Sequence, residues 1–117
     1  MKLVSSKNNQ TVFYIRSNDR ESLNSQNLKG EKYARQNSLS FSFIVDAKTS
    51  GLKPFSERPG MRKILQMVED GIVETVIVDS LNRISRDVEQ LLYFIEFLSK
   101  YHTKLVLLDG GFKNACK

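Results

Sequence analysis

Residues 75–87 read TVIVDSLNRISRD and combine the signals of a strand, a turn and a helix. The β-branched run 75–78 has no helical periodicity and predicts a buried strand. An amphipathic pattern begins near Asp87, and an aspartate favours a helix start by capping it and by interacting with the helix dipole. Arg83 and Arg86 therefore lie where a strand ends and a helix begins. In an open α/β sheet, ligands bind at this edge.

The rest of the chain continues this alternation of strand and helix signals. Strands are predicted at residues 11–15, 39–45, 74–79 and 104–108, and helices at 20–36, from 59 to a C-cap at Gly71, and from 87 to about 101. Residues 47–58 form the longest segment without predicted structure. We therefore predict an α/β fold, a three-layer αβα sandwich with a mostly parallel, roughly four-stranded sheet.

Length and composition limit the classes of protein to which the chain can belong. Its 117 residues suffice for one domain, and 40% of them are hydrophobic, enough for a real core. A net charge of +5 favours a polyanionic partner such as nucleic acid. Cys116 and His102 are the only residues of their types, which excludes an intrachain disulfide and a Cys/His zinc site. The lone cysteine fits a reducing cytoplasm, where we expect the protein, and no apolar run is long enough for a membrane span, so we expect no membrane partner.

The predicted elements divide the chain into three parts. Residues 1–10 are polar and predict a flexible N-terminal arm. Residues 11–112 hold all of the predicted strands and helices and form the domain. Residues 113–117 are expected to form a polar tail.

Polar and charged side chains follow the predicted strands. Because the carboxyl ends of parallel strands meet at one edge of a sheet, we expect these side chains to lie together, with Arg58 folded over them from the loop. The residues are Arg16, Ser17, Asn18, Asp19, Asp46, Ser50, Asn82, Arg83, Arg86 and Asp109. A hydroxyl among arginines suits phosphoryl transfer, since guanidinium groups neutralise a phosphodiester and its transition state without a metal. They also favour the serine alkoxide.

Two other interpretations remain open at this point. Ser17 suits an ordinary turn or helix cap equally well. The acidic strand ends are also compatible with a magnesium site of the receiver-like kind. That interpretation involves Asp19, Asp46, Asp79 and Asp109.

Four stretches of the sequence resemble, in order and at near-family spacing, the motifs of the serine site-specific recombinases, the resolvase/invertase family. YIRS at 14–17, followed by SLNSQ at 22–26, is similar to the opening motif of that family. DAKTSG at 46–51 resembles its mobile loop, ERPGM at 57–61 the Arg-Pro motif that follows, and LNRISR at 81–86 its Leu-Asp-Arg-Leu-x-Arg motif. The resemblance implies a resolvase catalytic-domain fold.

The resemblance also implies a mechanism. A serine attacks the DNA backbone, becomes linked to the 5′ end and releases a 3′ hydroxyl, with no metal and no nucleotide cofactor. By similarity, Ser17 is the nucleophile, Arg16, Arg58, Arg83 and Arg86 hold and activate the scissile phosphate, and Asp46 and Ser50 organise the site. Of the arginines, Arg58, Arg83 and Arg86 are the expected DNA contacts.

Two positions depart from the family pattern. The family has one residue between its motif arginine and its serine, whereas Ser17 directly follows Arg16. Counting forward from Tyr14 puts Asn18 at the nucleophile position, and counting back from Gln26 puts Ser17 there. Neighbours in a regular strand point to opposite faces, so Ser17 joins Arg16 only if the chain leaves strand geometry between them. Asn82 stands where the family usually has aspartate.

The family's oligomerisation helix and DNA-binding domain have no counterpart in this sequence. We therefore expect the catalytic domain of a serine DNA recombinase, which by analogy works on DNA as a homodimer or homotetramer in a full-length protein. One alternative is a catalytically inactive, DNA-associated module with the same fold. A less favoured alternative is a receiver-like or nucleotide-binding α/β domain.

Overall fold

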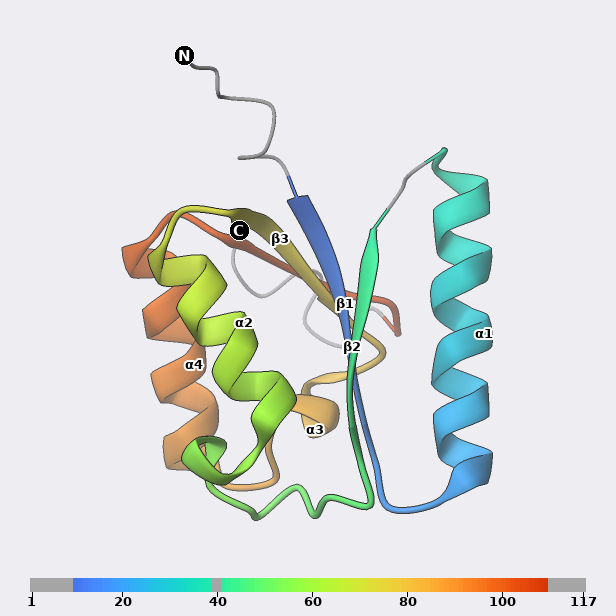
Figure 1. The fold of residues 1–117 in the computed structure, drawn as a ribbon, viewed down its shortest axis with the longest axis horizontal. Coiled ribbons are helices and arrows are strands. Elements are labelled where there is room, and N and C mark those ends of the chain that lie inside the picture. Colours follow the sequence, from blue (N-terminus) through green and yellow to red (C-terminus); the bar gives the residue numbers. More distant parts are fainter. Residues whose placement is uncertain (1–9, 39–40, 110–117) are drawn as a thin grey trace.

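The computed structural model of the chain describes residues 10–38 and 41–109, which form a parallel sheet with helices on both faces (Figure 1). The strands are β1 (Gln10–Ser17), β2 (Ser42–Ala47), β3 (Val73–Val78) and β4 (Lys104–Leu107). The helices are α1 (Arg20–Gln36), α2 (Pro59–Glu69), α3 (Leu81–Ile84) and α4 (Val88–Lys100), with a 3-10 turn, η2 (Phe55–Glu57). All pairings in the β2-β1-β3-β4 sheet are parallel, which confirms the predicted three-layer α/β fold. Residues 1–9 of the predicted arm and the 113–117 tail lie outside the described residues.

The two faces of β1 belong to two separate cores. Val12 and Tyr14 point into the larger one, between the sheet and helices α2 and α4. Phe13 and Ile15 point the other way, into the smaller core beneath α1. The central strand therefore sends alternate side chains to opposite layers, as a strand covered on both faces must.

Helix α1 contacts the sheet through a narrower face than its sequence predicts. The helical pattern of residues 20–36 predicts an apolar stripe that includes Leu28, but this side chain is 65% exposed, and the buried residues of the helix are Gln26 and Gly30. A Cβ on Gly30 would lie 2.8 Å from Phe43 Cε2 and 3.1 Å from the ring of Phe13. Close packing of Gly30 over aromatic rings therefore holds this helix, together with the partly buried Leu23 and Tyr33.

Strands β1 and β2 extend further than turn propensity predicts. The polar residues after Ile15 predicted a turn, yet Arg16 pairs with Asp46 and Ser17 with Ala47 in parallel register. Backbone pairing between neighbouring strands has overridden the local preference of these residues for turns. The sites at both strand ends are therefore built partly on strand and not on loop.

Candidate active site

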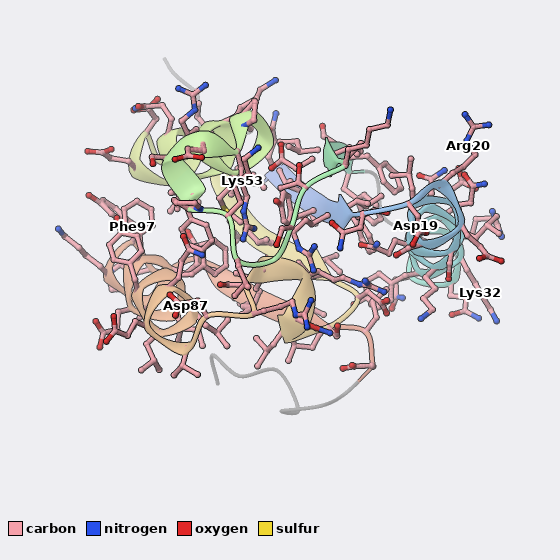
Figure 2. The ribbon with its side chains drawn as sticks, turned by 90° about the horizontal axis from the view of Figure 1, so that it is seen from below. Asp19, Arg20, Lys32, Lys53, Asp87 and Phe97 are labelled. Atoms are coloured by element: carbon pink, nitrogen blue, oxygen red, sulfur yellow. The ribbon has the colours of Figure 1, made fainter. Side chains whose placement is uncertain are left out.

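The carboxyl ends of β1 and β3 carry the arginines that the sequence places at this edge. Figure 2 looks onto the edge, with Asp19 and Asp87 at the starts of α1 and α4 and the loop that carries Lys53 across the middle of the view. This loop connects β2 with α2 and covers the strand ends.

Arg16 ties this edge together through three backbone carbonyls. Its Nε donates to the oxygen of Arg83 at 3.0 Å, its Nη1 to Thr49 at 2.8 Å and its Nη2 to Asn82 at 3.0 Å. Burial, followed by the positive charge of Arg58, lowers the pKa of the Arg16 guanidinium. The charges of Arg83 and Arg86 also lower this pKa, which shows that the guanidinium groups of the site act on one another.

Arg58 folds over the same edge, as predicted, but it is fully buried. Its Nε donates to the carbonyl oxygen of Lys53 at 3.0 Å and its Nη2 to that of Gly51 at 3.1 Å. Its Nη1 donates to the carbonyl oxygen of Ile84 and, at 3.4 Å, to the hydroxyl of Tyr14. In this conformation Arg58 fastens the loop, and its donors are turned away from solvent.

Asp46 connects the end of β2 with the start of α2. Its carboxylate accepts hydrogen bonds from the backbone N–H of Gly60 at 2.7 Å and of Met61 at 2.9 Å, and from the hydroxyl of Tyr14 at 2.8 Å. The carboxylate thus satisfies donors that the first turn of a helix leaves free. Burial, and then the negative charge of Asp46, raise the pKa of Tyr14.

Gly51 is the point where the loop touches the LNRISR motif at 81–86. Its carbonyl oxygen accepts from the backbone N–H of Arg86 at 2.9 Å and from the hydroxyl of Ser85 at 3.3 Å. A Cβ here would lie 2.5 Å from Arg86 Cγ, so only glycine fits without displacing that side chain. Ser50 is exposed, and its hydroxyl accepts from the backbone N–H of Leu52 at 3.0 Å.

Asp79 contacts the arginine site, although no pattern in the sequence predicts this. It is buried at the end of β3, where Oδ2 lies 3.3 Å from Nη2 of Arg83 and Oδ1 lies 3.0 Å from Nζ of Lys29 on α1. Nε of Arg83 is buried and finds no hydrogen-bond partner among the described residues. No sequence motif links Lys29 with Asp79, because they are 50 positions apart.

Ser17 does not join the arginines in this conformation. It is paired with Ala47, so strand geometry continues through it and directs its side chain to the face that α1 covers. Its hydroxyl donates to the carbonyl oxygen of Asp19 and accepts from the backbone N–H of Asp19 at 3.0 Å. Asn18 is the first residue beyond β1 and is exposed.

The acidic strand ends do not form a group. Asp19 caps α1, Asp46 binds the start of α2, and Asp79 lies between two cations. Across residues 10–38 and 41–109, no three His, Cys, Asp or Glu side chains come close enough together to hold a metal ion. Over the same residues, no helix combines the length and the apolar character that a bilayer crossing requires.

Comparison with known proteins shows to which family the chain belongs. Residues 11–115 match the family described as Resolvase, N terminal domain. The chain belongs to the resolvase family. Its four sequence motifs are thereby explained as motifs of that family, whose expected parallel α/β fold is the one described above.

Relatives of this resolvase-family domain include a DNA-invertase of Escherichia phage P1. The two are 35% identical over 79 residues, which make up 68% of this chain and 40% of the invertase. The resolvase-family domain thus spans less than half of that relative.

Solved structures give the same result at the level of the fold. The N-terminal catalytic domain of TP901-1 integrase superposes with a TM-score of 0.75 at 29% identity, covering 86% of this chain and 77% of that one. The C-terminal catalytic domain of ISC1926 TnpA, an IS607-like serine recombinase, superposes with a TM-score of 0.76 at 24% identity. That match covers 91% of this resolvase-family domain and 71% of the TnpA domain.

Proposed function

We propose that this chain is the catalytic domain of a serine recombinase, which cuts DNA through a 5′-phosphoserine link and rejoins it without a metal. The observation that carries the proposal is the gathering of three arginines at the strand ends, where Arg16 binds the carbonyl oxygen of Arg83 and the side chains of Arg16 and Arg86 both lie beside Gly51. Membership of the resolvase family supports the same reaction.

The arginines divide into two pairs by exposure. Arg16 and Arg58 are buried and bind backbone carbonyls, whereas Arg83 is partly exposed and Arg86 is exposed. We assign the first contact with the scissile phosphate to the second pair, because a guanidinium fork binds phosphate oxygens in a bidentate manner. Fixed positive charges stabilise the additional negative charge of a pentacovalent phosphorus most strongly when they are already in place.

The proposed chemical step uses the hydroxyl of Ser17. Its oxygen attacks the phosphorus, the bond from phosphorus to the 3′ oxygen breaks, and the serine becomes esterified to the 5′ phosphate. The serine proton leaves as the attack proceeds, and the departing 3′ oxygen takes up a proton to become a hydroxyl. Attack by a 3′ hydroxyl on the phosphoserine reverses these steps and rejoins the DNA.

Two local rearrangements must accompany this step. Ser17 has to leave its pairing with Ala47 and its hydrogen bonds with Asp19 before its hydroxyl can turn to the face of Arg16. Arg58 contacts DNA only after the loop that buries it opens. In this proposal Asp46 and Ser50 help to organise the site, Asp46 by holding the start of α2 and Ser50 by binding the backbone N–H of Leu52 within the loop.

The same proposal covers the partner and the setting. The net charge of +5 favours DNA, because each neutralised phosphate releases a counterion. By analogy with its family, the full-length protein acts as a homodimer or homotetramer. We also propose a cytoplasmic location, because a lone cysteine suits a reducing compartment.

A second candidate function is that of a catalytically inactive, DNA-associated module with the recombinase fold. Its support is the position of Ser17, in regular strand and on the face opposite to Arg16. If Asn18 keeps the nucleophile position, no hydroxyl is available there for attack.

One experiment separates the two functions. The full chain is fused to a dimerising helix and a DNA-binding domain of known target, and is incubated with a nicked suicide substrate that traps the covalent intermediate. We expect a protein–DNA adduct that Ser17→Ala abolishes and Asn18→Ala retains. Absence of an adduct with the unmodified chain, under conditions where the fusion occupies its target, would favour the non-cleaving module.

A further inference from the structure

Asp79 holds two cations that come from different layers of the fold. Arg83 approaches from α3 and Lys29 from α1, and each binds a different oxygen of the carboxylate. We infer that Asp79 is a positioning residue that aims the Arg83 guanidinium at the scissile phosphate. This inference rests on the proposed function.

The contact fixes one edge of a long side chain. Asp79 lies four positions before Arg83, and its Oδ2 binds Nη2 of that arginine at 3.3 Å. Nε of the same guanidinium is buried and has no partner among the described residues. Asp79 therefore holds Nη2, while Nε is shielded from water and its N–H donor is unused. Orienting an arginine before the substrate arrives removes an entropic cost from the reaction.

The positive charge around Asp79 exceeds the negative charge, which favours the binding of an anion. One carboxylate faces two cations, so the group of Asp79, Lys29 and Arg83 carries a net positive charge. The side chain of Lys29 is 53% exposed, whereas that of Arg83 is 25% exposed, so the pair of Asp79 with Arg83 lies in the drier surroundings. A phosphate that meets Arg83 would balance the remaining charge.

The neighbouring residue, Asn82, does not position the guanidinium of Arg83. Its side chain is an uncharged amide on an exposed residue, and only its backbone carbonyl takes part in the site, as an acceptor for Arg16. Among the described residues, the salt bridge of Arg83 is made with Asp79 alone.

The first test measures the protection of the Arg83 side chain and does not depend on DNA cleavage. In side-chain ¹⁵N–¹H spectra of the full chain, the Nε–H signal of Arg83 should exchange slowly with water because this nitrogen is buried. We expect Asp79→Asn to speed that exchange about tenfold or more, as in local opening of a protected group. Asp70→Asn removes an equal charge at the exposed end of α2 and should leave the signal unchanged. Lys29→Met should also leave it protected, because Oδ2 still binds Arg83.

The second test measures the reaction in the fusion described above. We expect Asp79→Asn to slow adduct formation about tenfold, the size of one charged hydrogen bond in a transition state, without weakening DNA binding. If Asp79 acted only through its charge, its loss in Asp79→Asn would instead tighten the binding of DNA. Asp79→Glu keeps the charge and provides a second variant if Asp79→Asn folds poorly. Its rate should lie between those of the unmodified chain and Asp79→Asn.

The two tests fail in different ways. If Arg83 exchanges equally slowly in the unmodified chain and in Asp79→Asn, the positioning role is wrong, whatever the enzyme does. An unchanged rate of adduct formation in both Asp79 variants would overturn it as well. If the unmodified chain forms no adduct, the proposed function fails while the exchange experiment still decides whether Asp79 holds Arg83.

Discussion

Arg16 donates from Nε to the backbone carbonyl oxygen of Arg83 at 3.0 Å, so one arginine of the site holds the turn that carries another. Its two remaining nitrogens bind the loop at Thr49 and the same turn at Asn82. A buried guanidinium therefore serves here as a three-way brace between β1, the β2–α2 loop and α3.

We predict that Arg16→Lys destabilises the protein. An ammonium group cannot reach three carbonyls in one plane, so at least one of them loses its donor in a buried place. The free energy of unfolding should fall by about 2–3 kcal/mol, the cost of an unsatisfied buried group near a charge. Urea denaturation measures it, with Arg62→Lys on the exposed side of α2 as the control. Equal stability of both variants would contradict the brace.

Asp46→Asn should weaken the anchoring of α2. Asparagine has one acceptor oxygen in place of two, so its NH2 group would face the N–H of either Gly60 or Met61. We expect a loss of roughly 2–3 kcal/mol in the free energy of unfolding, because hydrogen bonds to a charged group are replaced by an unsatisfied contact. Asp70→Asn, at an exposed position, should change stability by less than about 0.5 kcal/mol.

Gly30→Ala tests the close approach of α1 to the sheet. Alanine in place of glycine inside an exposed helix ordinarily stabilises it by about 0.5–1 kcal/mol. Here the new Cβ would lie 2.8 Å from Phe43 Cε2, so the helix or the ring must shift. We expect a destabilisation of about 1–3 kcal/mol, as in overpacked cores. Ser25→Ala on the exposed side of α1 is the control, and a stabilising Gly30→Ala would show that the aromatic cluster yields easily.

The pKa of Tyr14 predicts how stability changes at alkaline pH. Burial and Asp46 raise the pKa of this tyrosine above its ordinary value, so the folded chain keeps a proton that the unfolded chain releases above about pH 10. Stability from this group is complete below the unfolded pKa and declines as the pH rises toward the folded pKa. The decline is about 1.4 kcal/mol per pH unit for one proton.

Tyr14→Phe should be less stable than the unmodified chain at pH 8 and should lose less stability between pH 10 and 11. Urea denaturation at these pH values gives both numbers. Tyr93→Phe removes an exposed hydroxyl and leaves Tyr14 in place, so it should keep the decline. If Tyr14→Phe and the unmodified chain lost equal unfolding free energy between pH 10 and 11, Tyr14 would not be the cause of the decline.

Local patterns in the chain were enough to predict the layers of the fold. Apolar runs such as 75–78 alternate with helical periodicity, and this alternation allows few arrangements other than a parallel sheet between helices. The same local reasoning failed at Leu28, because an amphipathic stripe does not show that a helix will approach through a glycine. It also ended β1 before Arg16, because pairing with β2 depends on a partner strand 30 residues away.

The sequence by itself determined that arginines would follow the strand ends, since parallel strands end at one edge and the motifs name Arg16, Arg83 and Arg86. Only the tertiary structure decided what each one does. Arg58 became buried because the loop, at Lys53 and Gly51, and the end of α3, at Ile84, supply the carbonyl oxygens that it binds. Ser17 stayed on the face of α1 because strand pairing continues through it. Asp79 came to hold Arg83 and Lys29 because folding brings α1 to the end of β3, a contact that no local pattern encodes.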